Sequence, residues 1–277
     1  MPPLAGNTPT TLSNVTPAGV SRAGRIVAVC GARGGVGASS IALNLAVELT
    51  DTVEGHVALV DFHVQGGDIA LMLGVHPIPG LRAALENADR VDDFFLERVA
   101  IAIQPRLCLI AAEEPFEEDL SITAAGVARV LDVLLRKFDF AVIDIPMPLP
   151  REMHPVPRAA RQVVVVLTPD VASLRDTQAI RALITGITGG NRVTTVLNRS
   201  DMRGGLKAAL IERGLGVAPD IVIPELGKGM VEAINLGVPA VRRVPALRRA
   251  LAQLVREIAG IAPPAATRSW FRRVPRR

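Results

Sequence analysis

Short apolar runs alternate with amphipathic runs along most of the chain, and this alternation predicts a parallel sheet covered by helices. The first apolar run, Ile26 to Cys30, is followed by a glycine-rich segment and then by the amphipathic run Ser39 to Leu49. A later run, Gln162 to Thr168, is almost continuously apolar, which is typical of a central strand buried on both faces. The pattern therefore predicts an α/β fold of three layers, with a mostly parallel central sheet and helices on both faces.

The same pattern predicts the remaining elements. Further strands are expected at 56–61, 106–112, 140–146, 192–198 and 221–225. Helices are expected at 69–73, 121–138, 172–187 and 206–213, with two short helices within 81–100, a proline-rich loop up to residue 157, and two closing helices before residue 260. Because no long linker interrupts this series, residues 25–260 are expected to form one domain.

The glycine-rich segment has the outline of a phosphate-binding loop. The generic pattern G-x-x-x-x-G-K-[ST] places a lysine on the β- and γ-phosphates and a hydroxyl on magnesium. Here Gly37 and Ser39 match, but Ala32 replaces the first glycine, Ala38 replaces the lysine, and a cation lies earlier, at Arg33. Main-chain N–H groups at a helix N-terminus bind phosphate without any side chain. The expected phosphate-binding residues are Gly34, Gly35, Val36, Gly37, Ala38, Ser39 and Ser40, and the alternative is a glycine-rich turn that binds no ligand.

Polar residues close three of the predicted strands. Asp144 follows four apolar residues, as a carboxylate that holds magnesium beside a phosphate loop would. Asp61 ends another strand in the same way, so Ser39, Asp61 and Asp144 are the candidate Mg²⁺ ligands. Asn198 and Arg199 begin an N-R-S-D segment that resembles the guanine-reading N-K-x-D. Asn198 could equally contact an adenine edge, or could simply form the turn after its strand.

Composition limits the class of protein and its partners. Of 277 residues, 49% are hydrophobic and 21% are charged, which describes a well-filled core, and no apolar run is long enough to cross a bilayer. The net charge of +4 resides largely in five arginines after Ile261, so the body is close to neutral and DNA binding is not expected. The expected ends are a disordered leader at 1–24, without a secretory signal, and a basic tail at 261–277. This tail could contact membrane or a polar protein, or could only add solubility.

Cysteine and histidine give no sign of a metal motif. Cys30 and Cys108 each lie in an apolar run and are expected to be buried, reduced thiols. The four histidines are scattered along the chain without a ligand spacing.

Five ordered segments together resemble a known family. They are R-G-G-V-G-A-S-S from Arg33, V-A-L-V-D-F-H-V-Q-G-G-D ending at Asp68, F-D-F-A-V-I-D-I-P ending at Pro146, V-L-N-R-S-D-M ending at Met202, and E-A-I-N-L-G-V-P-A-V ending at Val241. They look like the deviant Walker A P-loop NTPases of the ParA/MinD group, and most of all like the CpaE/TadZ pilus-assembly branch, in which alanine commonly stands at the lysine position.

The resemblance implies ATP and Mg²⁺ as ligands and a face-to-face homodimer. Arg33 would take the place of the signature lysine that reaches the partner subunit's nucleotide. Ser39 would ligate magnesium, Ser40 would touch the α-phosphate, and Asp61 would be the first switch carboxylate, while His63 stands where the family has its second. With Arg33, Asp61 and Asp144 as the catalytic candidates but no lysine at Ala38, ATP hydrolysis is expected to be slow or negligible.

Two roles are compatible with that implication. The first is a nucleotide-dependent dimer that localises and recruits components of a Flp/Tad type IV pilus secretion system, in the cytoplasm and at the pole or inner-membrane surface. The alternative is a cycling ATPase for DNA partition or division-site placement, which would be expected to keep the lysine and the second carboxylate.

Overall fold

A single eight-stranded sheet runs through the molecule in the computed structural model, which describes residues 24–92, 94–190 and 192–262. The strand order is β3-β4-β2-β5-β1-β6-β7-β8. All neighbouring strands are parallel except β3, which pairs with β4 antiparallel at one edge. The strands are β1 (Arg25–Gly31), β2 (Val57–Asp61), β3 (Ile101–Gln104), β4 (Leu107–Ile110), β5 (Phe140–Asp144), β6 (Ala160–Leu167), β7 (Arg192–Leu197) and β8 (Ile221–Val222).

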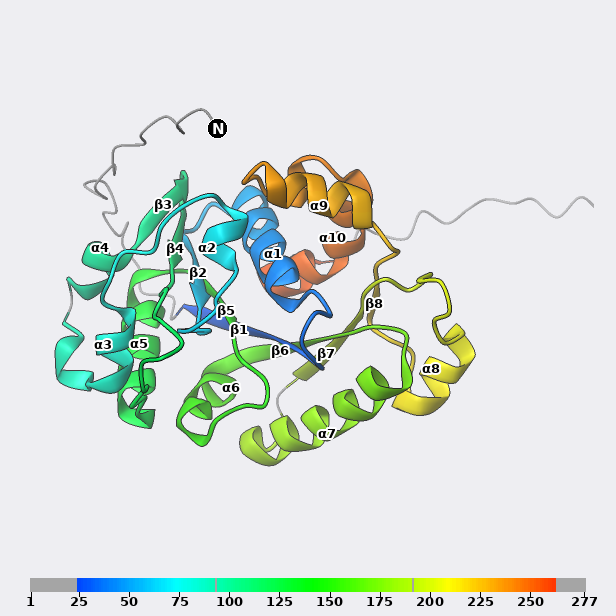
Figure 1. Ribbon diagram of the computed structural model, residues 1–277, viewed down its shortest axis with the longest axis horizontal. Helices are drawn as coiled ribbons and strands as arrows, with labels where there is room; N and C mark the ends of the chain where they lie inside the picture. The colour runs from blue at the N-terminus through cyan, green and yellow to red at the C-terminus, as the bar shows by residue number, and fades with distance from the viewer. Residues whose placement is uncertain (1–23, 93, 191, 263–277) are drawn as a thin grey trace, which may run out of the picture.

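Helices cover both faces of this sheet, as Figure 1 shows. One face carries α1 (Ala38–Thr52), α2 (Ile69–Met72), α9 (Gly227–Asn235) and α10 (Pro245–Ala259). The other carries α3 (Leu81–Glu86), α4 (Phe95–Val99), α5 (Ala124–Lys137), α6 (Pro155–Ala159), α7 (Val171–Thr188) and α8 (Ala208–Leu215). The three-layer α/β architecture expected from the sequence is confirmed.

The core divides between the two faces because side chains alternate along each strand. In β1, Ile26 and Ala28 belong to the buried cluster that includes residues of α5, whereas Val27 and Val29 belong to the cluster that includes residues of α1 and α10. The apolar runs of the central strands are thus explained by burial on both sides.

The differences from the sequence prediction include the start of one helix and two short elements that were not predicted. Helix α5 begins after Thr123, not Ser121, because the Thr123 side chain accepts the N–H of Gly126 and so caps the helix. The proline-rich loop contains the short helix α6, in which Pro155 occupies the first turn, where its missing N–H costs nothing. Strand β3 was not predicted, because its alternation is too short to stand out from the preceding helix.

Register places two acids side by side. In the pairing of β2 with β5, Val57 faces Phe140 and Asp61 faces Asp144. Both strands are parallel, so both aspartates lie at the carboxyl edge, where β1 leads into the glycine loop (Figure 1).

Within the part of the chain that the structure describes, no helix is both long and apolar enough to traverse a bilayer. The leader up to residue 23 and the arginine-rich tail from residue 263 lie outside the described residues.

Candidate functional site

The loop between β1 and α1 wraps around the N-terminus of α1. Gly35 and Gly37 have φ values of +79° and +95°, a conformation that side chains rarely adopt. A Cβ atom at Gly37 would lie 2.7 Å from Nδ2 of Asn198, so glycine is required there for space as well as for conformation. Since α1 begins at Ala38 without a side-chain cap, its first N–H groups face the loop and are free to bind an anion.

A cleft of about 340 Å³ lies over this loop. The loop residues that line it are Gly31, Arg33, Gly34, Gly35, Gly37, Ala38, Ser39 and Ser40, whereas the side chain of Val36 is buried. The rest of the lining is His63, Gly66, Asp68 and Met72 from the segment after β2, Ile145 and Met147 after β5, and Arg199. Ser39 and Ser40 both reach it, and the Ser40 hydroxyl lies 3.7 Å from the sulfur of Met72. The structure therefore brings together the loop and the ends of β2, β5 and β7, as expected.

Arg33 and Ala38 take the two positions at which the loop departs from the generic pattern. Arg33 is 45% exposed, and its Nε atom lies 3.8 Å from a carboxylate oxygen of Asp176 on α7. This contact is long and solvent-exposed, so it holds Arg33 only weakly and leaves it free to turn toward a ligand. Ala38 lies at the floor of the cleft and presents a methyl group there.

Asp61, His63 and Asp144 form a compact group beside the loop, and one potential ligand atom from each lies within 4.8 Å of the others. Nδ1 of His63 lies 3.1 Å from Oδ1 of Asp61 and 3.5 Å from Oδ2 of Asp144. The Asp61 carboxylate also accepts the main-chain N–H groups of His63 and Ile69, at 2.9 and 3.3 Å. Asp61 is therefore held in place by its own segment.

Asp144 has a different environment. Its side chain is fully buried, and neither carboxylate oxygen accepts a hydrogen bond from the residues that the structure describes. Burial, and then the charge of Asp61, raise the pKa of Asp144 to about 7, against the opposing effects of His63 and the nearby Ser39 hydroxyl. A buried carboxylate without hydrogen bonds is costly, which indicates a site prepared for a cation.

The pKa of His63 is raised as well. Burial alone would lower it, but the hydrogen bond to Asp61 and the charges of Asp144 and Asp61 outweigh burial. The imidazolium form of His63 is thus favoured by the two acids that surround it.

These residues fit a divalent cation. Mg²⁺ prefers hard oxygen ligands in octahedral geometry and keeps several waters. The Ser39 hydroxyl and the carboxylates of Asp61 and Asp144 supply such oxygens, and the unpartnered oxygens of Asp144 are the observation that supports the fit. A bound Mg²⁺ would supply charge that neutralises phosphate oxygens. His63, which offers a ring nitrogen, is the one member of the group that is not an oxygen ligand.

Asn198 braces the loop. Its Nδ2 donates to the carbonyl oxygen of Val36 at 2.8 Å, and its Oδ1 accepts the N–H of Arg199 at 3.0 Å. Arg199, at φ +54°, borders both the loop cleft and a neighbouring cavity lined by Ile223, Leu226 and Met230. Contact between Asn198 or Arg199 and a base stays a prediction, and bracing of Val36 is a role that the sequence did not suggest.

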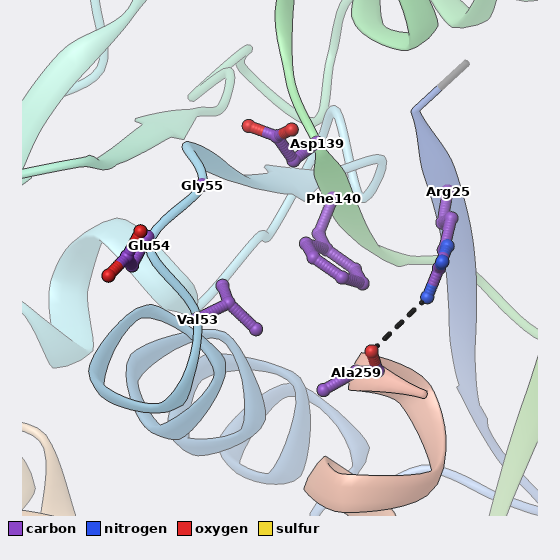
Figure 2. A pocket seen from close by; sticks show the side chains of 7 residues that line it. All are labelled: Arg25, Val53, Glu54, Gly55, Asp139, Phe140 and Ala259. Carbon is purple, nitrogen blue, oxygen red and sulfur yellow. Dashed lines mark hydrogen bonds between the residues drawn. The ribbon is translucent and has the colours of Figure 1, made fainter. Parts of the chain in front are cut away.

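A second cavity, of about 260 Å³, lies at the opposite edge of the sheet and is drawn in Figure 2. Arg25 enters it from the start of β1 and donates to the carbonyl oxygens of Ile258 and Ala259, at 3.2 and 3.3 Å. The guanidinium also lies 5.5 Å from the centre of the Phe140 ring. Arg25 thus satisfies the last carbonyl oxygens of α10. We assign this cavity a role in the stability of the fold and not in ligand binding.

Comparison with known proteins agrees with this geometry. A family model described as ParA, NUBPL iron-transfer P-loop NTPase, matches residues 22–92. The septum site-determining protein MinD of Helicobacter pylori is 23% identical over 248 residues, which cover 85% of this chain and 90% of that protein. The cell division ATPase MinD of Pyrococcus furiosus superposes with a TM-score of 0.72 at 26% identity, covering 86% of this chain and 100% of that one.

The chain is therefore similar in sequence and in fold to P-loop NTPases of the ParA/MinD group. The structure of MinD from Pyrococcus horikoshii in complex with Mg-ADP is also similar, with a TM-score of 0.71, 23% identity, and coverage of 84% of this chain and 95% of that one. Ala38 and His63 are the positions at which this chain departs from the lysine and the second carboxylate that the resemblance implies.

The sequence indicated most members of the site but not their partners. The resemblance placed His63 at the position of the second switch carboxylate, but its neighbour Asp144 is 81 positions away, so linear spacing held no signal of their contact. Asp176 and Met72 were also missed, because an acid on a helix and a methionine after a strand are common in any α/β protein.

Proposed function

We propose that this chain binds ATP with Mg²⁺ at the glycine loop, hydrolyses it slowly, and acts as a nucleotide-dependent homodimer that localises other proteins. The observation that carries the proposal is the juxtaposition of an uncapped helix N-terminus with two buried carboxylates at the ends of adjacent strands. Free N–H groups suit the phosphates, and the carboxylates suit the cation that accompanies them.

Binding can survive without the missing lysine. One charge-assisted hydrogen bond contributes about 1.5–3 kcal/mol, so its loss weakens affinity roughly 10–100-fold. The main-chain N–H groups of the loop, Ser39, and the cation remain. At millimolar ATP this is sufficient for occupancy.

Hydrolysis depends more strongly on what this chain lacks. Phosphoryl transfer requires charge on the transferring group and a positioned water. At the position where a lysine would supply the charge, Ala38 has only a methyl group. At the position where a carboxylate would orient the water, the segment after β2 has His63. Bound nucleotide would therefore act mainly by stabilising the homodimer, and repeated hydrolysis would contribute little.

The cellular role has two candidates. The relatives are named for septum-site determination and cell division, which favours placement of a division site or another cellular position. Assembly of a Flp/Tad pilus at the pole or inner-membrane surface is supported by the CpaE/TadZ resemblance and by alanine at position 38. DNA partition is less favoured, because the body of the chain is close to neutral without its arginine-rich tail.

Iron transfer, which the description of the family model mentions, has no support in the thiols. The chain has two cysteines. Cys30 and Cys108 are both buried, and burial raises the pKa of each thiol to about 12, so neither is available as a thiolate ligand.

Calorimetry with Mg-ATP tests the proposal. We expect binding that is lost on chelation of Mg²⁺ and weakened at least tenfold in Ser39→Ala. Ser121→Ala, at an exposed position before α5 and outside the cleft, serves as the matched control. A single-turnover assay with radiolabelled ATP should show a rate far below one per second. Absence of any heat with Mg-ATP, or rapid turnover, would contradict the binding claim or the slow-turnover claim respectively.

A further inference from the structure

We propose that Asp61, His63 and Asp144 form a binding site for a divalent transition metal such as Zn²⁺ or Co²⁺, which the chain binds directly and without nucleotide. This inference concerns the same edge of the sheet as the ATP site but does not depend on ATP binding. It rests on the geometry of three side chains and on the buried carboxylate of Asp144, which accepts no hydrogen bond from the described residues.

The two separations from the imidazole to the carboxylates are those of ligands that share one ion, and the three potential ligand atoms lie within 4.8 Å of one another. Zinc lies about 2.0–2.2 Å from its nitrogen and oxygen ligands, so two ligands at tetrahedral or octahedral angles are about 2.9–3.6 Å apart. Nδ1 of His63 lies 3.1 Å from Asp61 and 3.5 Å from Asp144. An ion can therefore enter the group with small side-chain movements.

Hydrogen bonds within the group do not satisfy all of its carboxylate oxygens. Nδ1 of His63 carries at most one proton, and its shorter contact is to Asp61. Asp144, which is fully buried, keeps both oxygens without a hydrogen-bond donor among the described residues. A cation placed between the three side chains would neutralise both carboxylates and give Asp144 a direct ligand contact in place of the 3.5 Å approach of His63.

The imidazole decides which cation fits. Carboxylate and water ligands suit Mg²⁺, Ca²⁺ and Mn²⁺, whereas imidazole suits Zn²⁺, Co²⁺, Ni²⁺ and Cu²⁺. A site of one imidazole and two carboxylates therefore prefers a borderline transition metal over Mg²⁺. His63 is 31% exposed, so the cleft gives the ion a path from solvent.

Other thiol and imidazole groups do not compete for the ion in the folded protein. Cys30 and Cys108 are buried and their thiols have raised pKa values. In the part of the chain that the structure describes, no other histidine, cysteine or acidic residues form a comparable cluster of three or more ligands.

The test uses tag-free, nucleotide-free full-length protein, freed of metal by chelation and then titrated calorimetrically with Zn²⁺ and separately with Mg²⁺. We expect one equivalent of Zn²⁺ to bind, more tightly than Mg²⁺. His63→Asn should weaken Zn²⁺ binding by at least 10–100-fold, roughly the effect of disturbing a zinc ligand's support. His76→Asn, which removes an exposed histidine outside the group, should leave it unchanged.

His63→Asp separates ligand type from ligand number. It restores three carboxylates, so Zn²⁺ affinity should fall while Mg²⁺ affinity should not. Visible absorption of the Co²⁺ complex gives a second readout, because loss of the imidazole nitrogen should change the spectrum in His63→Asp but not in His76→Asn.

A measurement on the wild type protects the test against a variant that does not fold. In protein labelled with ¹⁵N-histidine, one equivalent of Zn²⁺ should shift the ring nitrogens of one histidine of the four. Zn²⁺ binding no tighter than that of Mg²⁺, equal Zn²⁺ affinity in His63→Asn, or shifts spread over several histidines would overturn the inference. Since no nucleotide is present, none of these results depends on whether Mg-ATP binds.

Discussion

Ala38 is the residue at which the loop differs most in chemistry from the generic phosphate-binding pattern. Its methyl group lines the cleft at the first residue of α1, so a longer side chain at this position would border the cleft as well. The position contributes main-chain geometry but no charge. Binding and hydrolysis are therefore expected to respond differently to a change here.

Ala38→Lys should raise the single-turnover rate of ATP hydrolysis on the order of 10²-fold, because it places a positive charge on the transferring phosphoryl group. The rate measured with radiolabelled ATP checks this. Ala38→Met, of similar length but uncharged, is the matched control and should leave the rate low. Equal rates in wild type and Ala38→Lys would show that His63, or another residue, limits hydrolysis.

Asp144 couples stability to pH, and the direction follows from its pKa. The carboxyl has an ordinary pKa of 3.8 when unfolded and about 7 when folded, so between these values the folded state holds a proton that the unfolded state releases. Stability of the metal-free protein should therefore fall as pH rises from about 4 to about 7. The raised pKa of His63 acts in the same direction.

Asp144→Asn should raise the melting temperature of the metal-free, nucleotide-free protein more at pH 8 than at pH 5. At pH 5 the buried carboxyl is already neutral, and asparagine changes little. Thermal unfolding in the presence of EDTA measures the difference. Asp119→Asn, at an exposed position, should show no such pH dependence, and a uniform effect of Asp144→Asn at both pH values would contradict the assignment.

At the scale of elements, the strand–loop–helix unit is held together by a contact from β7. Asn198 follows β7 and bonds to the loop carbonyl of Val36, while α1 is fixed from its other side by α10. Asn44 accepts the N–H of Val241, in the segment just before α10, and Glu48 pairs with Arg248 of α10 at 3.1 Å. The free N–H groups of α1 thus keep a fixed direction before any ligand arrives.

Gly37→Ala tests how closely the loop and β7 fit. The added Cβ would lie 2.7 Å from Asn198, in a left-handed conformation that costs alanine about 1–2 kcal/mol by itself. We expect the free energy of unfolding to fall by about 1–3 kcal/mol in urea titration. Gly34→Ala, where a Cβ meets open space, should change it by less than about 0.5 kcal/mol. Equal stability of the two variants would refute the close fit.

At the scale of the whole molecule, four adjacent strands end at the same edge of the sheet, the carboxyl edge. Strands β1, β2, β5 and β6 are parallel, so the loops that directly follow them all lie at this edge (Figure 1). Arg33 lies in the loop after β1 at this edge, and its side chain is nearly half exposed. A second copy of the chain that docked there would meet both the nucleotide and this arginine.

We expect Mg-ATP to convert the protein to a homodimer, and Arg33→Ala to reduce that conversion at least tenfold in the dimer dissociation constant, because the guanidinium can pair bidentately with phosphate. Light scattering coupled to size-exclusion chromatography measures it. Arg249→Ala, on the exposed side of α10, is the matched control. A dimer that forms without nucleotide, or one unaffected by Arg33→Ala, would contradict this prediction.

The sequence by itself determined the layer architecture, the order of most elements and the residues of the loop. It could do so because apolar periodicity, strand-ending acids and glycine spacing are local properties of the chain. The exceptions are also local: β3 and α6 are short, and a threonine rather than the nearby serine caps α5.

Tertiary structure alone decided which side chains meet. The parallel register of β2 with β5 sets Asp61 beside Asp144, and the turn after β2 brings His63 back between them. Burial at that point leaves Asp144 without a hydrogen-bond partner among the described residues and raises its pKa. Contacts between residues dozens of positions apart depend on strand order and register, which no local pattern encodes, and they determine the charge and the ligand preference of this site.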